Sequence, residues 1–74
     1  MPVSIFTHTF IGSDAVSRAT YDDTSHVLTI TFRDGWKQYA YYGVPSSVWI
    51  EFTHASSAGH YVQSRIKPYY SLRR

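Results

Sequence analysis

The C-terminal segment of the chain combines positive charge with aromatic rings. Its chemistry-bearing members are Arg65, Lys67, Tyr69, Tyr70, Arg73 and Arg74. Lysine and arginine side chains neutralise phosphates, and unpaired bases stack on aromatic rings. The segment is therefore the best candidate in the sequence for contact with nucleic acid. The alternative is a solvated tail that aids solubility.

The net charge of +2 is unevenly distributed along the chain. All five acids lie between Asp14 and Glu51, where three basic residues oppose them and leave a charge of −2. From Phe52 onward there are four basic residues and no acid, which gives +4. A basic end on a nearly neutral body suggests contact with phosphates or with an acidic protein surface.

A second candidate contact surface surrounds the dipeptide Asp34-Gly35. Arg33 and Trp36 flank this dipeptide, and Lys37 and Tyr42 follow in the next β-rich run. An exposed tryptophan beside an arginine is a typical hot spot for a protein partner or a stacked base. The alternative is that the aromatic residues of the N-terminal arm cover the tryptophan.

The histidines and acids form no recognisable catalytic or metal-binding pattern. His54 and His60 are separated by a Ser-Ser-Ala-Gly break, and no His-x-x-x-His spacing occurs. The chain has no cysteine, so neither a thiolate zinc site nor a disulfide can form. We therefore expect no catalysis, no metal and no cofactor. A small hydrolase that uses a histidine is the weakest alternative.

Two β-rich runs of similar length meet at Asp34-Gly35, which is a strong hairpin signal. A two-residue type I′ turn at this dipeptide predicts the pairs Arg33/Trp36, Phe32/Lys37, Ile30/Tyr39 and Leu28/Tyr41. One face of the hairpin is then apolar and must be covered, whereas the face with Trp36 and Tyr42 is mostly small and polar. Tyr39 and Tyr41 lie on the apolar face, so we favour core packing over a role as a base-stacking platform.

The rest of the chain supplies neighbours and a cover for this hairpin. Residues 16–21 are predicted to form a third antiparallel strand, and residues 1–15 an N-terminal arm or an extra edge strand. Pro45 begins a helix with an apolar stripe, and a second short helix, capped by Ser56 or Ser57, ends before Pro68. The predicted fold is α+β: a three- to four-stranded antiparallel β-meander with two short helices packed on one face.

The order of these signals resembles the KTSC domain, which is named for the C-terminal appendage of some lysyl-tRNA synthetases. The matching residues are Tyr39 and Tyr41, Val44-Pro45 with Val48-Trp49, Ala55 with Ser57, Gly59 and Tyr61, and Ile66-Lys67 with Tyr70. The resemblance covers residues 16–70 and leaves residues 71–74 as a basic tail. Trp49 stands where the family commonly has a tyrosine, and Val62-Gln63 where it commonly has an aromatic residue and an asparagine.

The resemblance implies a small module that binds RNA. The size of the chain and its short arm also resemble phage-encoded proteins that dock on host RNA polymerase. We therefore expect a non-catalytic binding module in transcription or RNA metabolism, which binds RNA or docks on RNA polymerase as a regulator. A protein interaction module unrelated to nucleic acid is the alternative.

No membrane span or signal peptide is evident in the sequence, so we expect a cytoplasmic protein of a bacterial cell or of a phage-infected host. We expect a monomer or a weak homodimer. An exposed sheet edge at residues 16–21 or 36–42 would allow two copies to pair.

Overall fold

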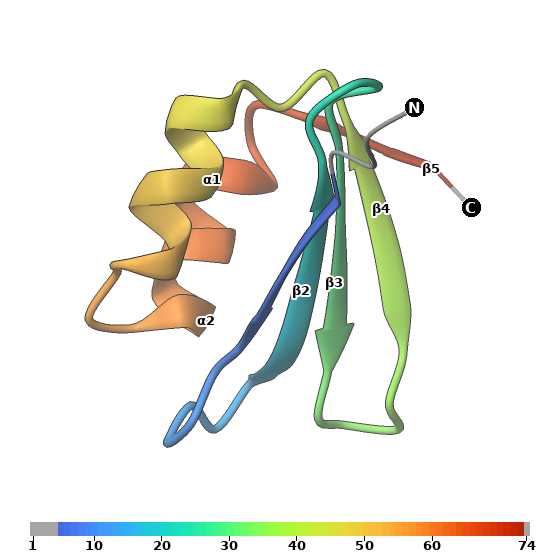
Figure 1. Cartoon of the computed structure of the whole chain (residues 1–74). Coiled ribbons are helices and arrows are strands. Elements are labelled where there is room, and N and C mark those ends of the chain that lie inside the picture. Colours follow the sequence, from blue (N-terminus) through green and yellow to red (C-terminus); the bar gives the residue numbers. More distant parts are fainter. Residues whose placement is uncertain (1–4, 74) are drawn as a thin grey trace.

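An antiparallel sheet carries the helices on one of its faces (Figure 1). The computed structural model describes residues 5–73. Its elements are β1 (Ile5–Thr9), β2 (Val16–Asp22), β3 (Val27–Phe32), β4 (Gln38–Tyr42), α1 (Ser46–Thr53), α2 (Ala58–Tyr61), η1 (Val62–Ile66) and β5 (Ser71–Arg73). The strands lie in the sheet in chain order, and each pairs antiparallel with its neighbour. The predicted α+β meander with two short helices on one face is confirmed.

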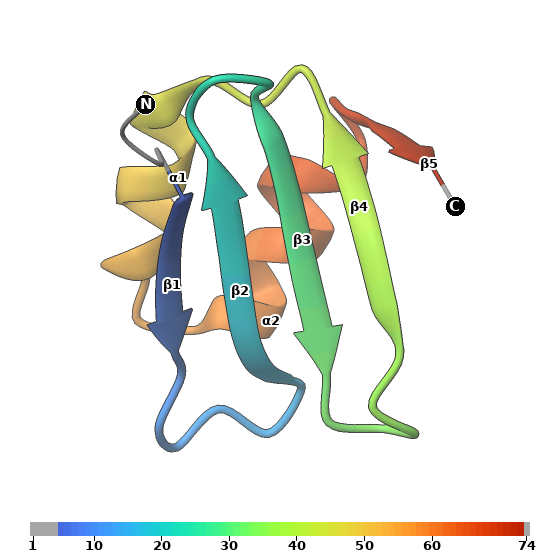
Figure 2. The same cartoon turned by 45° about the vertical axis from the view of Figure 1, so that its right-hand side comes forward.

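Both ends of the chain add strands to the meander (Figure 2). Residues 5–9 of the predicted arm form β1 on β2, and residues 71–73 of the predicted tail form β5 on β4. The described sheet therefore has one strand more than the expected maximum of four. A strand of three residues after a proline break is too short to show alternation, so its pairing depends on the neighbouring strand.

The predicted register of the β3–β4 hairpin is confirmed, but the predicted turn is wrong. Leu28 pairs with Tyr41 and Ile30 with Tyr39, and the N–H of Phe32 donates to the carbonyl of Lys37 at 2.8 Å. The left-handed residues of the loop are Gly35 (φ 70°) and Trp36 (φ 54°), whereas a type I′ turn at Asp34-Gly35 requires them at positions 34 and 35. The connection is thus a four-residue loop, and Arg33 and Trp36 lie outside the strand ladder.

The side chains that face the helices form an aromatic core. The largest fully buried ones are Tyr21, Phe52, Leu28, Ile30, Ile66, Val16, Val44 and Val62. The ring of Phe52 contacts the rings of Phe10 and Tyr61, with centroids 4.8 and 5.7 Å apart. Aromatic rings bury large areas, which compensates for the small core that a chain of this length can build.

The helices start and end where the residue types allow. Pro45 precedes α1, and the Ser57 hydroxyl caps α2 by accepting a hydrogen bond from the N–H of His60 at 3.3 Å. The second helix continues through η1, where the N–H of Lys67 donates to the carbonyl of Val62 at 2.8 Å. This bond spans five residues, so the last turn is π-helical. Pro68 follows, as expected for a helix end.

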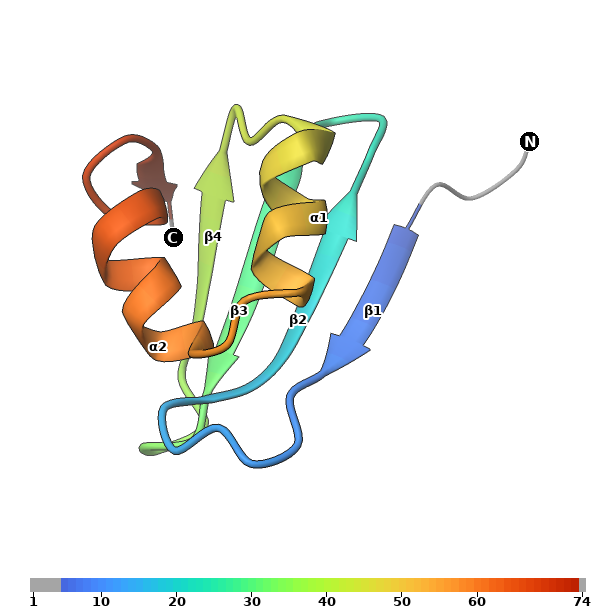
Figure 3. The same ribbon diagram turned by 90° about the vertical axis from the view of Figure 1, so that its left-hand side faces the viewer.

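The helices lie over the middle of the sheet and leave β1 beside them (Figure 3). Strand β1 covers residues 18–22 of β2, and β5 covers residues 40–42 of β4, so much of both edges that we expected to be exposed is already paired. The outermost strands of the described sheet are β1 and β5. None of the helices formed by the described residues has the length and apolar character needed to cross a bilayer.

Candidate functional site

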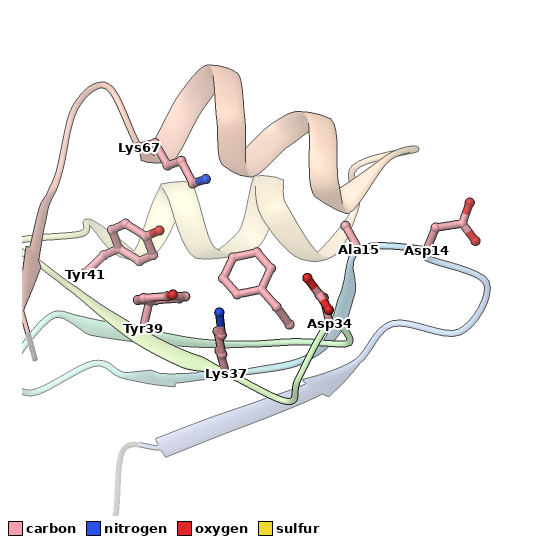
Figure 4. A pocket seen from close by; sticks show the side chains of 8 residues that line it. Asp14, Ala15, Asp34, Lys37, Tyr39, Tyr41 and Lys67 are labelled. Carbon is pink, nitrogen blue, oxygen red and sulfur yellow. The ribbon is translucent and has the colours of Figure 1, made fainter.

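A hollow of about 460 Å³ lies on the helix-bearing face, between the β3–β4 hairpin and the end of η1 (Figure 4). Its lining residues are Asp14, Ala15, Phe32, Asp34, Lys37, Tyr39, Tyr41 and Lys67. We call this feature the hairpin hollow.

The alternation of the hairpin supplies the aromatic wall of the hairpin hollow. Phe32, Tyr39 and Tyr41 lie on the face that carries the helices, but the helices cover only one end of it. Tyr41 is 2% exposed, whereas Phe32 and Tyr39 are only partly buried. The rings of Phe32 and Tyr39 meet edge to face with centroids 5.6 Å apart. A partly open ring at this position gives a flat ligand a surface for stacking.

Two lysines from distant parts of the chain reach the hairpin hollow. Lys37 follows the hairpin loop, and Lys67 is the first residue after η1. Figure 4 shows their ammonium groups entering the space between helix and hairpin from opposite sides. The two cations are therefore placed to hold an anionic group between them.

Acidic residues limit the positive potential of the hairpin hollow. Asp34 and Asp14 also line it, so its two lysines and two aspartates sum to a formal charge of zero. Asp14 lies at the end farthest from Tyr41 and Lys67 (Figure 4). Burial raises the pKa of Tyr41, and the neighbouring Tyr39 adds to the effect, so the Tyr41 phenol stays protonated near neutral pH. The end near Lys67 thus combines a cation with the neutral phenol of Tyr41, and the far end carries a carboxylate.

Arg33 stabilises the fold in a way that its sequence position did not indicate. Its guanidinium donates to the carbonyl of Ser13 at 2.6 Å and to the carbonyl of Phe10 at 2.9 Å. The backbone N–H of Arg33 donates to the carbonyl of Ala15 at 2.9 Å. These bonds fasten the β1–β2 loop to the tip of the hairpin. At least two of its side-chain donors are therefore occupied by the protein itself.

Trp36 and Tyr42 are exposed, as expected. Trp36 is 64% exposed at the tip of the hairpin, and Tyr42 is 44% exposed on the face without helices. The part of the N-terminal arm that forms β1 does not cover either residue, because β1 and β4 are separated in the sheet by β2 and β3.

The structure divides the basic C-terminal segment. Arg65 lies at a separate depression between α1 and α2, beside Glu51 and His60, and not at the hairpin hollow. Tyr69 is 69% exposed, whereas Tyr70 packs against the core. Arg73 belongs to β5, where its backbone pairs with Ala40. Arg74 lies outside the described residues.

Tyr39 packs against the core, as predicted, but it also lines the hairpin hollow, which was not predicted. Alternation assigned it correctly to the helix-bearing face, but the position at which the helix cover stops depends on tertiary structure. Phe32, Asp14 and Asp34 also line the hairpin hollow without having been predicted. The carboxylates carry no local signal, because loop aspartates are common in turns. No cluster of three or more potential metal ligands occurs among the described residues.

The fold and the hairpin hollow together define a small α+β domain with a depression beside its central hairpin that is lined by aromatic rings, two lysines and two aspartates. The family model described as the KTSC domain matches residues 12–70, so the chain belongs to the KTSC domain family. A protein of Tsukamurella paurometabola is 34% identical over 58 residues, which cover 78% of this chain and 85% of the relative. The crystal structure of a KTSC domain protein from Yersinia pestis is similar with a TM-score of 0.83 at 27% identity, and the match covers 95% of this chain and 96% of the other.

Proposed function

We propose that this protein is a non-catalytic module that binds single-stranded RNA through the hairpin hollow. The observation that carries this proposal is the convergence of Lys37 and Lys67 on a depression walled by Phe32 and Tyr39. A phosphate between the two ammonium groups leaves the adjoining base or sugar within the aromatic part of the hollow. Stacking and phosphate contact are the two elements that single-strand recognition ordinarily combines.

The charges of the hairpin hollow set the strength that we expect. With two lysines and two aspartates in the lining, binding is expected to be weak and only moderately dependent on salt. Each lysine–phosphate contact adds about 0.7 to the magnitude of the slope of log affinity against log salt for a single strand. Loss of both lysines therefore lowers this magnitude by about 1.4.

The test is a salt series of fluorescence anisotropy with a labelled oligouridylate of about ten nucleotides. The double variant Lys37→Ala/Lys67→Ala should lose affinity and flatten the salt slope, while Tyr39→Ala should weaken binding by roughly tenfold through lost stacking. Arg65→Ala removes an exposed cation away from the hairpin hollow and is the matched control. Equal damage by Arg65→Ala, or unchanged binding by the double variant, would contradict the proposal.

A second candidate function, docking on RNA polymerase as a regulator, is favoured by Trp36. Trp36 is 64% exposed at the tip of the hairpin, and tryptophan is enriched at the hot spots of protein–protein interfaces. Affinity capture from nuclease-treated bacterial lysate, with wild type, Trp36→Ala and Tyr69→Ala, separates the two functions. Polymerase subunits that are retained by wild type and by Tyr69→Ala but lost with Trp36→Ala would support docking. Retention of none would leave RNA binding as the function.

A further inference from the structure

Exposed apolar side chains gather beside the edge strand β1. Ile5 is 50% exposed, Phe6 51%, and Ile50 of α1 56%, and Ile11, just after the strand, is 94% exposed. Phe6 and Ile50 line one shallow apolar depression together with Trp49. Four of the seven large apolar side chains that are exposed among the described residues therefore lie on this side of the molecule.

The outer backbone edge of β1 is available for pairing. The N–H of Phe10 donates to the carbonyl of Ser17, and β1 pairs with β2 in register with this bond. Because the direction of backbone groups alternates along a strand, Phe6 and His8 point their N–H and C=O groups at β2. Ile5, Thr7 and Thr9 then point theirs away from the sheet, where no other strand lies within the described part of the chain.

The strand has none of the features that usually prevent edge pairing. Its sequence, Ile-Phe-Thr-His-Thr, contains no charged residue and no proline. Natural sheets ordinarily protect a free edge with lysine, proline or a bulge. An unprotected neutral edge flanked by apolar side chains is complementary to an equally neutral strand.

We propose that two copies of this chain pair through β1, antiparallel and centred on Thr7. In this register Thr7 meets Thr7 of the second copy, and Ile5 meets Thr9, so outward-pointing groups meet each other along the whole strand. Phe6 meets His8 on the helix-bearing face. The ring of His8 already contacts the ring of Phe10 at 4.6 Å, and Phe10 contacts Phe52 at 4.8 Å. Phe6 of the second copy therefore continues an aromatic row that ends at the edge, which favours a second copy over an unrelated peptide.

The symmetric position gives a selective cross-linking test, because the chain has no native cysteine. In a hydrogen-bonded antiparallel pair the Cα atoms lie about 5.5 Å apart, within the range of a disulfide. Thr7→Cys should therefore form a covalent dimer under mild oxidation that a thiol reductant reverses. Ile5→Cys is the matched control. In the proposed register residue 5 faces Thr9 of the second copy, so the two cysteines are four residues, or about 13 Å, apart along the strand. Equal cross-linking of the two variants, or none of Thr7→Cys, would overturn the proposal.

A second measurement is the mass of the protein without cross-links, determined by analytical ultracentrifugation over a concentration series. Wild type should reach twice the chain mass, and Thr7→Lys should weaken the dimer several-fold, since it places two like charges directly opposite each other. Gln38→Lys adds the same charge to an exposed residue of β4 and should leave the dimer unchanged. A wild type that stays monomeric, or a dimer that Thr7→Lys does not weaken, would exclude pairing through β1. Neither result bears on RNA binding, which the variants of the hairpin hollow test separately.

Discussion

The two ends of the central sheet each contain a turn with a non-glycine residue in the left-handed region. His26 has φ 61° in the β2–β3 turn, and Trp36 has φ 54° in the β3–β4 loop. At the β2–β3 turn, the backbone of His26 forms hydrogen bonds within the fold. The carbonyl of His26 accepts from the N–H of Val44 at 3.0 Å, and the backbone N–H of His26 donates to the carbonyl of Asp22 at 2.8 Å.

The side chain of His26 is also bound into this end. The hydroxyl of Tyr21 donates to the carbonyl of Val44 at 2.6 Å and lies 3.1 Å from Nδ1 of His26. Because the hydroxyl has one proton, Nδ1 of His26 is the donor to Tyr21. Burial raises the pKa of Tyr21, with the charges of Asp23 and Asp22 adding to it, so the phenol remains protonated. The left-handed conformation of His26 is thus compensated by hydrogen bonds to the strand and to the chain entering α1.

At the other end, the indole of Trp36 is mostly exposed, in the loop between Asp34 and Lys37, which both line the hairpin hollow. A bulky residue with positive φ is rare and costs of order 1–3 kcal/mol unless other contacts compensate. Uncompensated strain of this kind occurs mainly at functional sites. The two ends therefore differ: hydrogen bonds hold the left-handed residue at the His26 turn, whereas the left-handed residue of the β3–β4 loop exposes its indole to solvent.

The largest effect should separate the two tyrosines of β4. Tyr41 lies toward the compensated end and is 2% exposed, so Tyr41→Ala should lower the free energy of unfolding by about 3–5 kcal/mol. Tyr39, toward the hairpin loop, is only partly buried, and Tyr39→Ala should cost about 1–2 kcal/mol. Urea unfolding of both variants measures the difference. Equal losses would mean that the hairpin hollow is closed in solution.

Replacement of the left-handed residues by glycine tests the comparison directly. Trp36→Gly removes the strain of a side chain at positive φ and should raise the free energy of unfolding by about 1 kcal/mol. It should at the same time abolish any docking that depends on the indole. His26→Gly relieves similar strain but loses the hydrogen bond to Tyr21, so its stability should gain less or fall. A larger gain for His26→Gly, measured in the same urea titration, would reverse the assignment of the two turns.

These differences also mark what the sequence was able to predict. Alternation around Asp34-Gly35 predicted the register of the hairpin, and Pro45 predicted the start of the first helix. For the second helix, the sequence left Ser56 and Ser57 open as the cap, and the structure shows Ser57. The length of the loop was not predictable in this way, because a two-residue turn and a four-residue loop place the same residues in register. The dipeptide signal favoured the shorter turn, whereas the chain adopts positive φ one residue later.

The hairpin hollow depends on contacts between distant segments. The position of the hairpin hollow depends on where the second helix stops covering the sheet. Lys67 reaches the hollow from the end of a π-helical turn, which no residue pattern predicted. Contact of Arg33 with a partner stays a prediction. Its hydrogen bonds to Ser13 and Phe10 were not predictable, because they depend on the path of residues 10–15, which local sequence does not specify. Alternation therefore predicted which side chains share a face, but not which of them remain accessible.

Arg33 provides a smaller test of the exposed end. Arg33→Ala removes the two side-chain bonds to the carbonyls of Ser13 and Phe10, and the exposed position limits the expected loss to about 1 kcal/mol. Amide hydrogen exchange should increase in residues 10–15, while the salt slope of RNA binding stays close to that of wild type. If Arg33→Ala instead flattened the slope as Lys37→Ala is expected to do, the guanidinium would belong to the RNA-binding surface.

The smallest effect concerns the contact that joins the two helices above the core. The hydroxyl of Tyr61 donates to Oε1 of Glu51 at 2.8 Å, and burial together with this bond raises the pKa of Tyr61 from 10.0 to about 12. A raised tyrosine pKa stabilises the fold fully below pH 10, and this stabilisation is lost as the pH rises from 10 to about 12. Solvent screening at this partly exposed site reduces the contribution to below about 1 kcal/mol. Comparison of wild type and Tyr61→Phe across this pH range should show a steeper alkaline loss in wild type, whereas the exposed Tyr69→Phe should follow wild type. If Tyr61→Phe lost stability as steeply as wild type, ionisation of Tyr61 would not contribute to the alkaline loss. The bond to Glu51 would then be a surface contact that does not affect how the helices cover the sheet.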